Sequence, residues 1–168
     1  KHHIKKIFTH NSLPSPKDHY AISKLEAEKT LWEISSRTGL EVVIVRLPLV
    51  YGENAPGNYG ALERLAKSML PLPFLNTRNK RSMVSVELVA KVIKSIAASK
   101  KKYLGLHLLA EKKPYSTKEI IEKIRAKSGL TPMLFPVSGA FMKFILSAAG
   151  KQKIYEQLYE DLEFVSTI

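Results

Sequence analysis

The chain has 168 residues, of which 45% are hydrophobic and 25% are charged, as in one soluble globular domain or a large piece of one. It contains no cysteine, which excludes disulfides and thiolate metal sites, and it has no uncharged apolar run of about 18 residues, the length of a membrane span. The formal net charge of +12 favours anionic partners such as nucleotide phosphates, nucleic acid or an acidic membrane. Because the lysines are scattered, a solvated basic surface is the simpler interpretation.

The first predicted elements are a helix and a buried strand. Residues 1–17 are expected to be irregular, since two prolines lie close together there. Asp18 is a suitable N-cap, apolar and small residues then recur at helical spacing, and Gly39 suits the end of a helix, which predicts a helix from about 19 to 38. The apolar, β-branched run 41–45 is typical of a parallel strand covered on both faces. We expect it to be central, with one of its two neighbours missing from this chain.

The rest of the chain alternates predicted helices and strands. Helices are expected near 59–69, 87–99, 116–129, 139–148 and 151–163, and strands near 83–86 and 105–109, with a short extended piece near 133–135. Apolar residues of the 87–99 helix, Ile93 among them, should face inward, and Ser116 and Glu119 form a capping-box pattern. The most apolar stretch, 133–150, is interpreted as a loop and a buried helix, with contact at a membrane surface as a minor alternative. This order indicates an α/β protein with a largely parallel sheet.

Tyr20 and Lys24 are a candidate catalytic pair. Four residues apart on a helix, the two side chains lie on one face. The spacing carries no weight alone, because seven tyrosines and abundant lysines would give about one such pair by chance. A surface pair on an amphipathic helix is therefore the plain alternative.

The surrounding sequence gives the pair its meaning. After the 41–45 strand comes the run Arg46-Leu47-Pro48-Leu49-Val50-Tyr51-Gly52, followed by Asn58 and by Arg81-Ser82-Met83-Val84-Ser85-Val86-Glu87. With the Tyr20–Lys24 pair, this order resembles the extended short-chain dehydrogenase/reductase family, which includes nucleotide-sugar epimerases and dehydratases such as UDP-glucose 4-epimerase. The resemblance spans most of the chain. Leu47 and Glu87 are mild departures, standing where many relatives have proline and aspartate.

The resemblance implies the C-terminal part of a Rossmann-like, doubly wound parallel sheet with a small α/β substrate-binding domain. Residues 1–50 and about 83–110 would belong to the dinucleotide-binding domain. Residues about 51–82 and 111–168 would form the substrate-binding domain.

The resemblance also implies roles for individual residues. Tyr20 would be the acid/base, and Lys24 would favour its phenolate and anchor the cofactor, since a free tyrosine with a pKa near 10 is a poor base at neutral pH. The backbone at Pro48 would approach the nicotinamide. Asn58 and Arg81 would bind the substrate's diphosphate, a role that suits the planar fork of an arginine.

Other polar residues have structural interpretations. Arg46 follows a buried strand and is expected to make a structural ion pair, and His107 is expected to be a core histidine without metal-ligand spacing around it.

The sequence lacks two parts of the expected active site. No Gly-x-x-Gly-x-x-Gly loop occurs in it, so it contains no cradle for the cofactor's pyrophosphate. The family's catalytic serine or threonine would precede Lys1. The chain has no initial methionine or signal peptide and ends at Ile168 on an apolar run, so we expect a portion of a longer protein, inactive alone.

The resemblance predicts a portion of an NAD-dependent nucleotide-diphosphate-sugar 4-epimerase, with NADP left open as cofactor. A 4-reductase or a dehydratase of the same family is the alternative, and a non-catalytic binding or scaffold member is the alternative of another class. A cytoplasmic enzyme of polysaccharide biosynthesis is expected, with a homodimer by resemblance only. It should not insert stably in a membrane, and no motif supports nucleic-acid binding.

Overall fold

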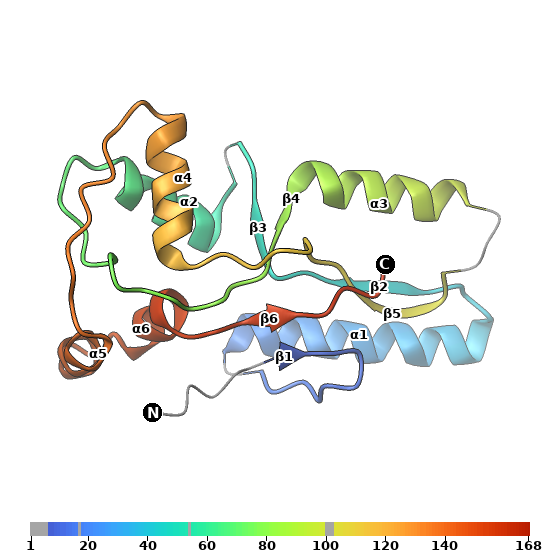
Figure 1. The fold of residues 1–168 in the computed structure, drawn as a ribbon. Coiled ribbons are helices and arrows are strands. Elements are labelled where there is room, and N and C mark those ends of the chain that lie inside the picture. The colour runs from blue at the N-terminus through green and yellow to red at the C-terminus, as the bar shows by residue number, and fades with distance from the viewer. Residues whose placement is uncertain (1–6, 17, 54, 100–102) are drawn as a thin grey trace.

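The computed structural model describes residues 7–16, 18–53, 55–99 and 103–168. All its strands pair in parallel: β1 (Ile7–Phe8) with β6 (Glu163–Phe164), β2 (Val43–Arg46) with β5 (Gly105–Leu108), and β3 (Leu49–Tyr51) with β4 (Met83–Ser85). In Figure 1, α1 (His19–Thr38) and α3 (Val86–Ala98) lie on opposite sides of the β2–β5 pair. The remaining four helices lie together on the left of the view in Figure 1. They are α2 (Gly57–Lys67), α4 (Thr117–Lys127), α5 (Gly139–Ala148) and α6 (Gln152–Tyr159). The predicted α/β class with parallel strands is confirmed.

The boundaries of α1 follow from its end signals, as the sequence predicts. The Asp18 side chain accepts a hydrogen bond from the backbone N–H of Ala21 at 2.9 Å, which satisfies one of the free donors of the first turn. At the other end, Gly39 has a φ of 75°, and its N–H donates to the carbonyl of Ser35. Only glycine adopts that left-handed conformation at little cost, so the helix ends there.

The strand β2 is fixed by burial and by β5. Val42 and Ile44 are buried, and the register runs from Val43 opposite Gly105 to Arg46 opposite Leu108. On the far side of β5, the Thr167 N–H donates to the Leu108 carbonyl. Within the described residues β2 has β5 as its only strand partner, so the expected second neighbour is not found there.

Two expectations near the ends of the chain are wrong. The segment 1–17, expected to be irregular, includes β1, and the helix expected over 151–163 is the shorter α6, followed by β6. Each of these strands has two residues and pairs with the other across almost the whole chain. Such a long-range pairing leaves no local periodicity in the sequence.

Two expectations about burial also fail. The helix 139–148 forms as predicted, but α5 has no buried residue. In α3, Ile93 is 54% exposed instead of facing inward. Apolar spacing fixes the face of a helix but does not show whether another element covers it.

The main hydrophobic core lies between α2, α4 and the loop before β4. Its buried members are Leu62, Ala66, Leu72, Phe74, Met83, Ile120, Ile121 and Ile124. All but Met83 fall within the ranges expected for the substrate-binding domain; the domain division itself stays a prediction.

Arg125 on α4 crosses this core and is only 1% exposed. Its Nε donates to the Ala66 carbonyl at 2.8 Å, and its Nη2 donates to the carbonyls of Ser68 at 3.0 Å and Leu70 at 2.7 Å. Its Nη1 faces the Pro132 carbonyl. The guanidinium thus joins the end of α2 to the segment after α4, and its partners are backbone dipoles.

We predict that Arg125→Met destabilises the protein by about 3 kcal/mol or more, because several buried carbonyls lose their donor. The measurement is urea unfolding followed by circular dichroism. Arg37→Met, at the exposed end of α1, is the control and should change the free energy of unfolding by less than about 0.5 kcal/mol. A similar effect of the two substitutions would contradict the role of Arg125.

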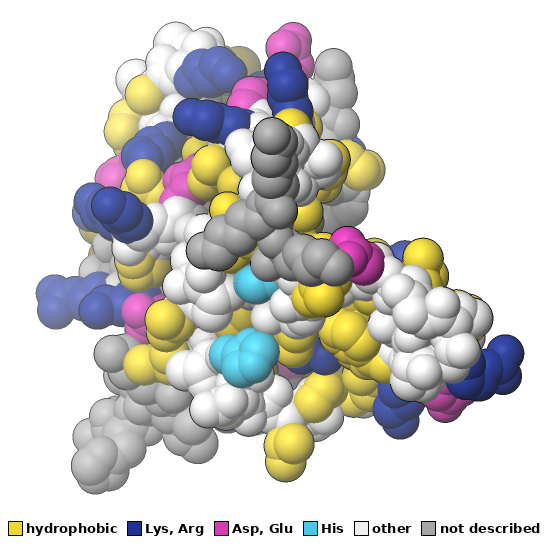
Figure 2. All heavy atoms as spheres, turned by 90° about the vertical axis from the view of Figure 1, so that its right-hand side faces the viewer, with side chains coloured by type: hydrophobic (Ala, Val, Ile, Leu, Met, Phe, Trp, Pro, Cys, Tyr) yellow, Lys and Arg dark blue, Asp and Glu magenta, His cyan; other side chains and the backbone are white. Residues whose placement is uncertain are grey.

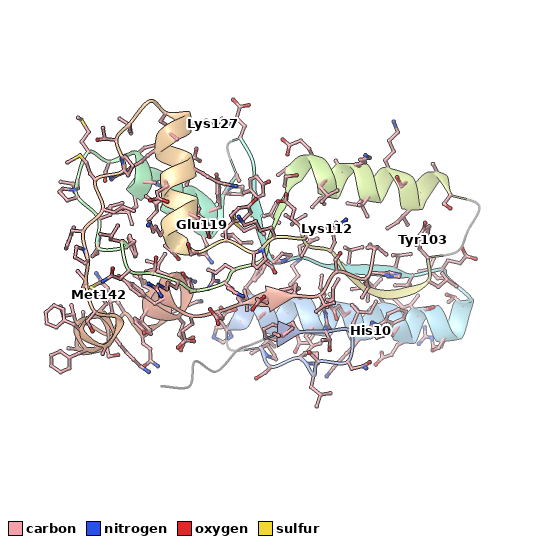
Figure 3. The ribbon with its side chains drawn as sticks, in the orientation of Figure 1. His10, Tyr103, Lys112, Glu119, Lys127 and Met142 are labelled. Atoms are coloured by element: carbon pink, nitrogen blue, oxygen red, sulfur yellow. The ribbon has the colours of Figure 1, made fainter. Side chains whose placement is uncertain are left out.

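The predicted capping box at the start of α4 is confirmed (Figure 3 labels Glu119). The backbone N–H of Ser116 donates to Glu119 Oε2 at 2.7 Å, and the Glu119 N–H donates to Ser116 Oγ at 3.1 Å. The hydrogen bond from the Ser116 backbone holds the pKa of Glu119 below its ordinary value of 4.5.

A lowered folded-state pKa stabilises the fold above the unfolded value, and this contribution is lost as pH falls through the folded value. We therefore predict that the free energy of unfolding differs less between about pH 7 and about pH 3 in the Glu119→Gln variant than in the unaltered protein. Urea midpoints at the two pH values test this. Glu122→Gln, on the same helix, is the control, and an equal narrowing in both variants would refute the assignment.

Candidate functional site

The Tyr20–Lys24 pair lies in the first turns of α1. Tyr20 is 73% exposed, and the Lys24 Nζ lies 5.6 Å from the centroid of the Tyr20 ring. The helical spacing therefore brings the ammonium group over the phenol, as expected from the sequence. Both side chains are open to a molecule that approaches this end of the helix.

An ion pair between α1 and β2 sets where the Tyr20 end of the helix lies. The Arg46 Nε donates to Glu28 Oε1 at 2.9 Å, and its Nη2 donates to Glu28 Oε2 at 2.5 Å. The hydrogen bonds that Arg46 donates to the Glu28 carboxylate raise the pKa of Arg46, so the guanidinium stays charged. Because Glu28 is one turn after Lys24, this fork places the start of α1 beside the carboxyl end of β2. The structural ion pair expected for Arg46 is confirmed.

Pro48 lies at the same end of the sheet. It is half-buried and separates β2 from β3, directly after the strand that carries Arg46. The carboxyl end of a parallel strand is where ligands bind in doubly wound folds. Pro48 thus follows the strand end that the Glu28–Arg46 ion pair joins to α1, the helix that carries Tyr20 and Lys24.

Asn58 and Arg81 lie on other elements. Asn58 is exposed in the first turn of α2. The Arg81 Nη1 donates to the carbonyls of Glu156 at 3.2 Å and Glu160 at 3.0 Å, at the end of α6. Burial lowers the pKa of Arg81, although Asp161 and Glu160 partly oppose the shift. A cation at the end of a helix is stabilising, so this arginine has a structural role; its role toward a diphosphate stays a prediction.

His107 has the structural role that the sequence indicates. It is half-buried in β5, and its Nε2 lies 3.0 Å from the Tyr103 carbonyl. No cluster of three or more metal-ligating side chains occurs among the described residues.

The structure adds a cavity that the sequence does not reveal. It has a volume of about 790 Å³ and lies between β3, α2, α4 and the start of α3. Its lining includes Tyr51, Tyr59 and Tyr115 together with the charged residues Glu63 and Lys123. None of the five predicted site residues is among the described residues that line it. Two of the sequence motifs pointed toward this region, because the Arg46–Gly52 run supplies Tyr51 and Gly52 to the lining and the Arg81–Glu87 run supplies Met83 and Glu87.

Tyr51 is held in place at the wall of that cavity. Its hydroxyl donates to Glu111 Oε1 at 2.7 Å, and the backbone N–H of Ser85 donates to the same oxygen at 3.2 Å. Burial and the Glu111 carboxylate raise the pKa of Tyr51 well above its usual value. Tyr51 therefore stays a neutral phenol and is unsuited to act as a base.

A second hollow of about 420 Å³ lies at the opposite end of α1. Trp32, Leu40 and Val42 line it with Leu104 and Gly105. Figure 2 views this end of the molecule and shows hydrophobic side chains at its surface. The hollow is far along α1 from Tyr20, and Glu41 is the one ionisable residue among the described residues that line it.

Comparison with known proteins identifies the family. A model of an NAD-binding family, described as male sterility protein, matches residues 1–93, which is more than half of the chain. The chain belongs to this NAD-binding family. The membership of the short-chain dehydrogenase/reductases that the Tyr20–Lys24 and Arg46–Gly52 patterns predict is confirmed, and so is the expectation of NAD as the family's cofactor.

The relatives of this family member include UDP-sugar 4-epimerases. UDP-glucose 4-epimerase of Vibrio cholerae is 31% identical over 150 residues, which are 89% of this chain and 46% of the relative. UDP-N-acetylglucosamine 4-epimerase from Bacillus cereus superposes with a TM-score of 0.69 at 20% identity, over 95% of this chain and 51% of that chain. UDP-glucuronic acid 4-epimerase from Bacillus cereus, in complex with NAD, gives 0.66 at 20% identity, over 78% and 43%. The chain spans about half the length of these relatives, and the two structures establish its fold.

We predict that Glu28→Gln destabilises the protein by about 1 kcal/mol, because Arg46 then keeps only a neutral partner in a partly buried place. Thermal unfolding followed by circular dichroism measures the change. Glu26→Gln, on the exposed side of the same helix, is the control. If both substitutions leave the midpoint unchanged, the ion pair does not hold α1 on β2.

Proposed function

We propose that the chain supplies the acid/base part of the active site of an NAD-dependent 4-epimerase of nucleotide-diphosphate sugars. One observation supports the proposal: the Lys24 ammonium lies over the Tyr20 ring, one turn before Glu28, which pairs with Arg46 at the start of the Arg46–Gly52 run. The 31% identity to UDP-glucose 4-epimerase of Vibrio cholerae supports this substrate class.

The chain's residues fit one end of the cofactor. Tyr20 and Lys24 are exposed near the start of α1, and Pro48 follows β2, the strand that the Glu28–Arg46 ion pair joins to α1. These groups suit the nicotinamide and its ribose. The pyrophosphate needs a glycine-rich turn at a helix N-terminus, and the sequence contains no Gly-x-x-Gly-x-x-Gly loop. In this proposal, the part of the protein outside these 168 residues supplies that turn. NADP remains an alternative, because its determinant would lie in the same part.

Tyr20 carries the proton in the proposed reaction. The phenolate takes the proton from the sugar's C4 hydroxyl as the C4 hydride leaves, and it returns the proton when hydride is delivered to the other face of the ketone. NAD, when bound, accepts and returns the hydride. Lys24 stabilises the phenolate through its positive charge and binds the ribose hydroxyls. Asn58 and Arg81 bind the diphosphate.

Related reactions use the same residues in part. A 4-reductase would use only the second half of the sequence of steps, with Tyr20 as the acid. A 4,6-dehydratase needs a further acid/base pair beside the tyrosine. Ala21 and its neighbours in the chain offer no such pair, which favours the epimerase or the reductase.

A non-catalytic binding member of the family is the second candidate. NAD binding by the whole protein separates the two candidates. An intact cofactor site supports the enzyme, and its absence supports a binding or scaffold role.

We predict that Tyr20→Phe in the whole protein lowers kcat for UDP-sugar epimerisation by about a hundredfold or more and leaves NAD binding unchanged. The reason is that the ring remains while the proton carrier is lost. Tyr20 is 73% exposed, so folding should be unaffected. The measurements are coupled turnover assays with UDP-sugars and titration with NAD.

Tyr155→Phe is the matched control, since it also removes one phenolic hydroxyl but lies on α6 in a stack with Tyr159. Its turnover should equal that of the unaltered protein. Unchanged kcat in the Tyr20→Phe variant would refute the assignment of Tyr20 as the acid/base.

A further inference from the structure

An apolar helix lies at the edge of the molecule without cover. Phe141, Phe144 and Ile145 of α5 occupy one helical face, and their exposed fractions are 57%, 72% and 41%. Figure 3 shows phenyl rings that project outward from α5, on the side away from the other helices. Contiguous exposed apolar surface of this kind marks an interaction site in a soluble protein.

Two further apolar side chains are exposed in the segment that leads into α5. Met133 and Phe135 are 47% and 42% exposed. Their backbone is fixed, because the Leu72 N–H donates to the Met133 carbonyl at 3.0 Å and the Phe135 N–H donates to the Leu72 carbonyl at 3.0 Å. We call Met133, Phe135, Phe141, Phe144 and Ile145 the apolar edge.

The charged residues next to the apolar edge in the sequence are basic. From Leu130 to Tyr155 the sequence has three lysines and no aspartate or glutamate. Lys143 is on α5 itself, with its Nζ 5.8 Å from the centroid of the Tyr155 ring, and Lys151 follows the helix. Lys153 is paired with Asp18 at 2.7 Å. Exposed phenylalanines flanked by lysines are the features of a helix that lies in a lipid–water interface.

We propose that the apolar edge docks on the surface of an anionic lipid bilayer. The phenylalanines of α5 enter the boundary between headgroups and acyl chains, while Lys143 and Lys151 contact the lipid phosphates. None of the helices in the described part of the chain has the length and hydropathy to cross a bilayer, so the contact is peripheral. A second copy of the chain fits this surface poorly, because it would bring an equally basic segment against the first.

The Lys153–Asp18 ion pair links the region of the apolar edge to α1. Asp18 caps α1 two residues before Tyr20, and Lys153 is in the first turn of α6, just after α5. This exposed ion pair connects the helix that follows the docked edge to the N-cap of the helix that carries Tyr20.

Sedimentation with lipid vesicles tests the proposal on the full chain. We expect pelleting with vesicles of phosphatidylcholine mixed with phosphatidylglycerol, weakening as salt is raised, and little pelleting with phosphatidylcholine alone. Phe144→Ser should lower the partition coefficient by about tenfold, since one buried phenyl ring is lost. Lys143→Glu should also lower it, and more so at low salt.

Matched substitutions on α3 are the controls. Ile93→Ser removes an apolar side chain that is 54% exposed, and Lys94→Glu reverses an exposed charge; both should keep the original partition coefficient. Circular dichroism checks that each variant is folded. Equal binding to neutral and anionic vesicles, or unchanged binding of a folded Phe144→Ser variant, would overturn the proposal. A dimer that Phe144→Ser dissociates, in a chain that ignores vesicles, would assign the edge to a second copy and overturn it as well.

Discussion

The guanidinium of Arg125 is the interaction on which the α2–α4 half of the structure depends. A helix ends with carbonyls that lack intrahelical partners, and a buried loop adds more of them. Arg125 supplies its donors to such groups at the end of α2, in the following loop and in the segment after α4. Its charge is held by backbone dipoles, which converge on one point from three parts of the chain. The course of the chain on both sides of this core follows from that convergence.

The position of the candidate site depends on a second arginine, which makes a smaller set of hydrogen bonds. Glu28 and Arg46 join α1 to the end of β2 through a two-bond fork. Because the chain reverses at Gly39, the start of α1 has to lie near the end of β2, and the fork fixes the contact. The exposed Tyr20 and Lys24 therefore owe their position to residues that take no part in chemistry. Arg81 differs from Arg46, because the sequence predicts that it binds a ligand. In the structure its guanidinium donates hydrogen bonds to carbonyls at the end of α6.

Short-range sequence patterns predicted the structural features that depend on neighbouring residues, such as the ends of helices. Asp18 and Gly39 fixed the ends of α1, and the Ser116–Glu119 pattern fixed the start of α4. The family motifs identified the Tyr20–Lys24 pair and the strand that follows. Two-residue strands that pair across the chain, such as β1, escaped prediction, because their hydrogen bonds join distant segments. The burial of Arg125 and the exposure of α5 also escaped it, since an apolar or charged pattern does not reveal what packs against it.

Trp32, the single tryptophan of the chain, lines the hollow between α1, β2 and β5. The core around Arg125 contains several tyrosines and one phenylalanine, Phe74, and lies on other elements. Intrinsic fluorescence at the tryptophan wavelength therefore reports the docking of α1, while far-ultraviolet dichroism reports all the helices together. Coincident transitions of the two signals would show that the α1–β2 part and the Arg125 core unfold as one cooperative unit, and separated transitions would show two. The protein thus carries its own optical probe of how tightly its acid/base helix is coupled to the rest of the fold.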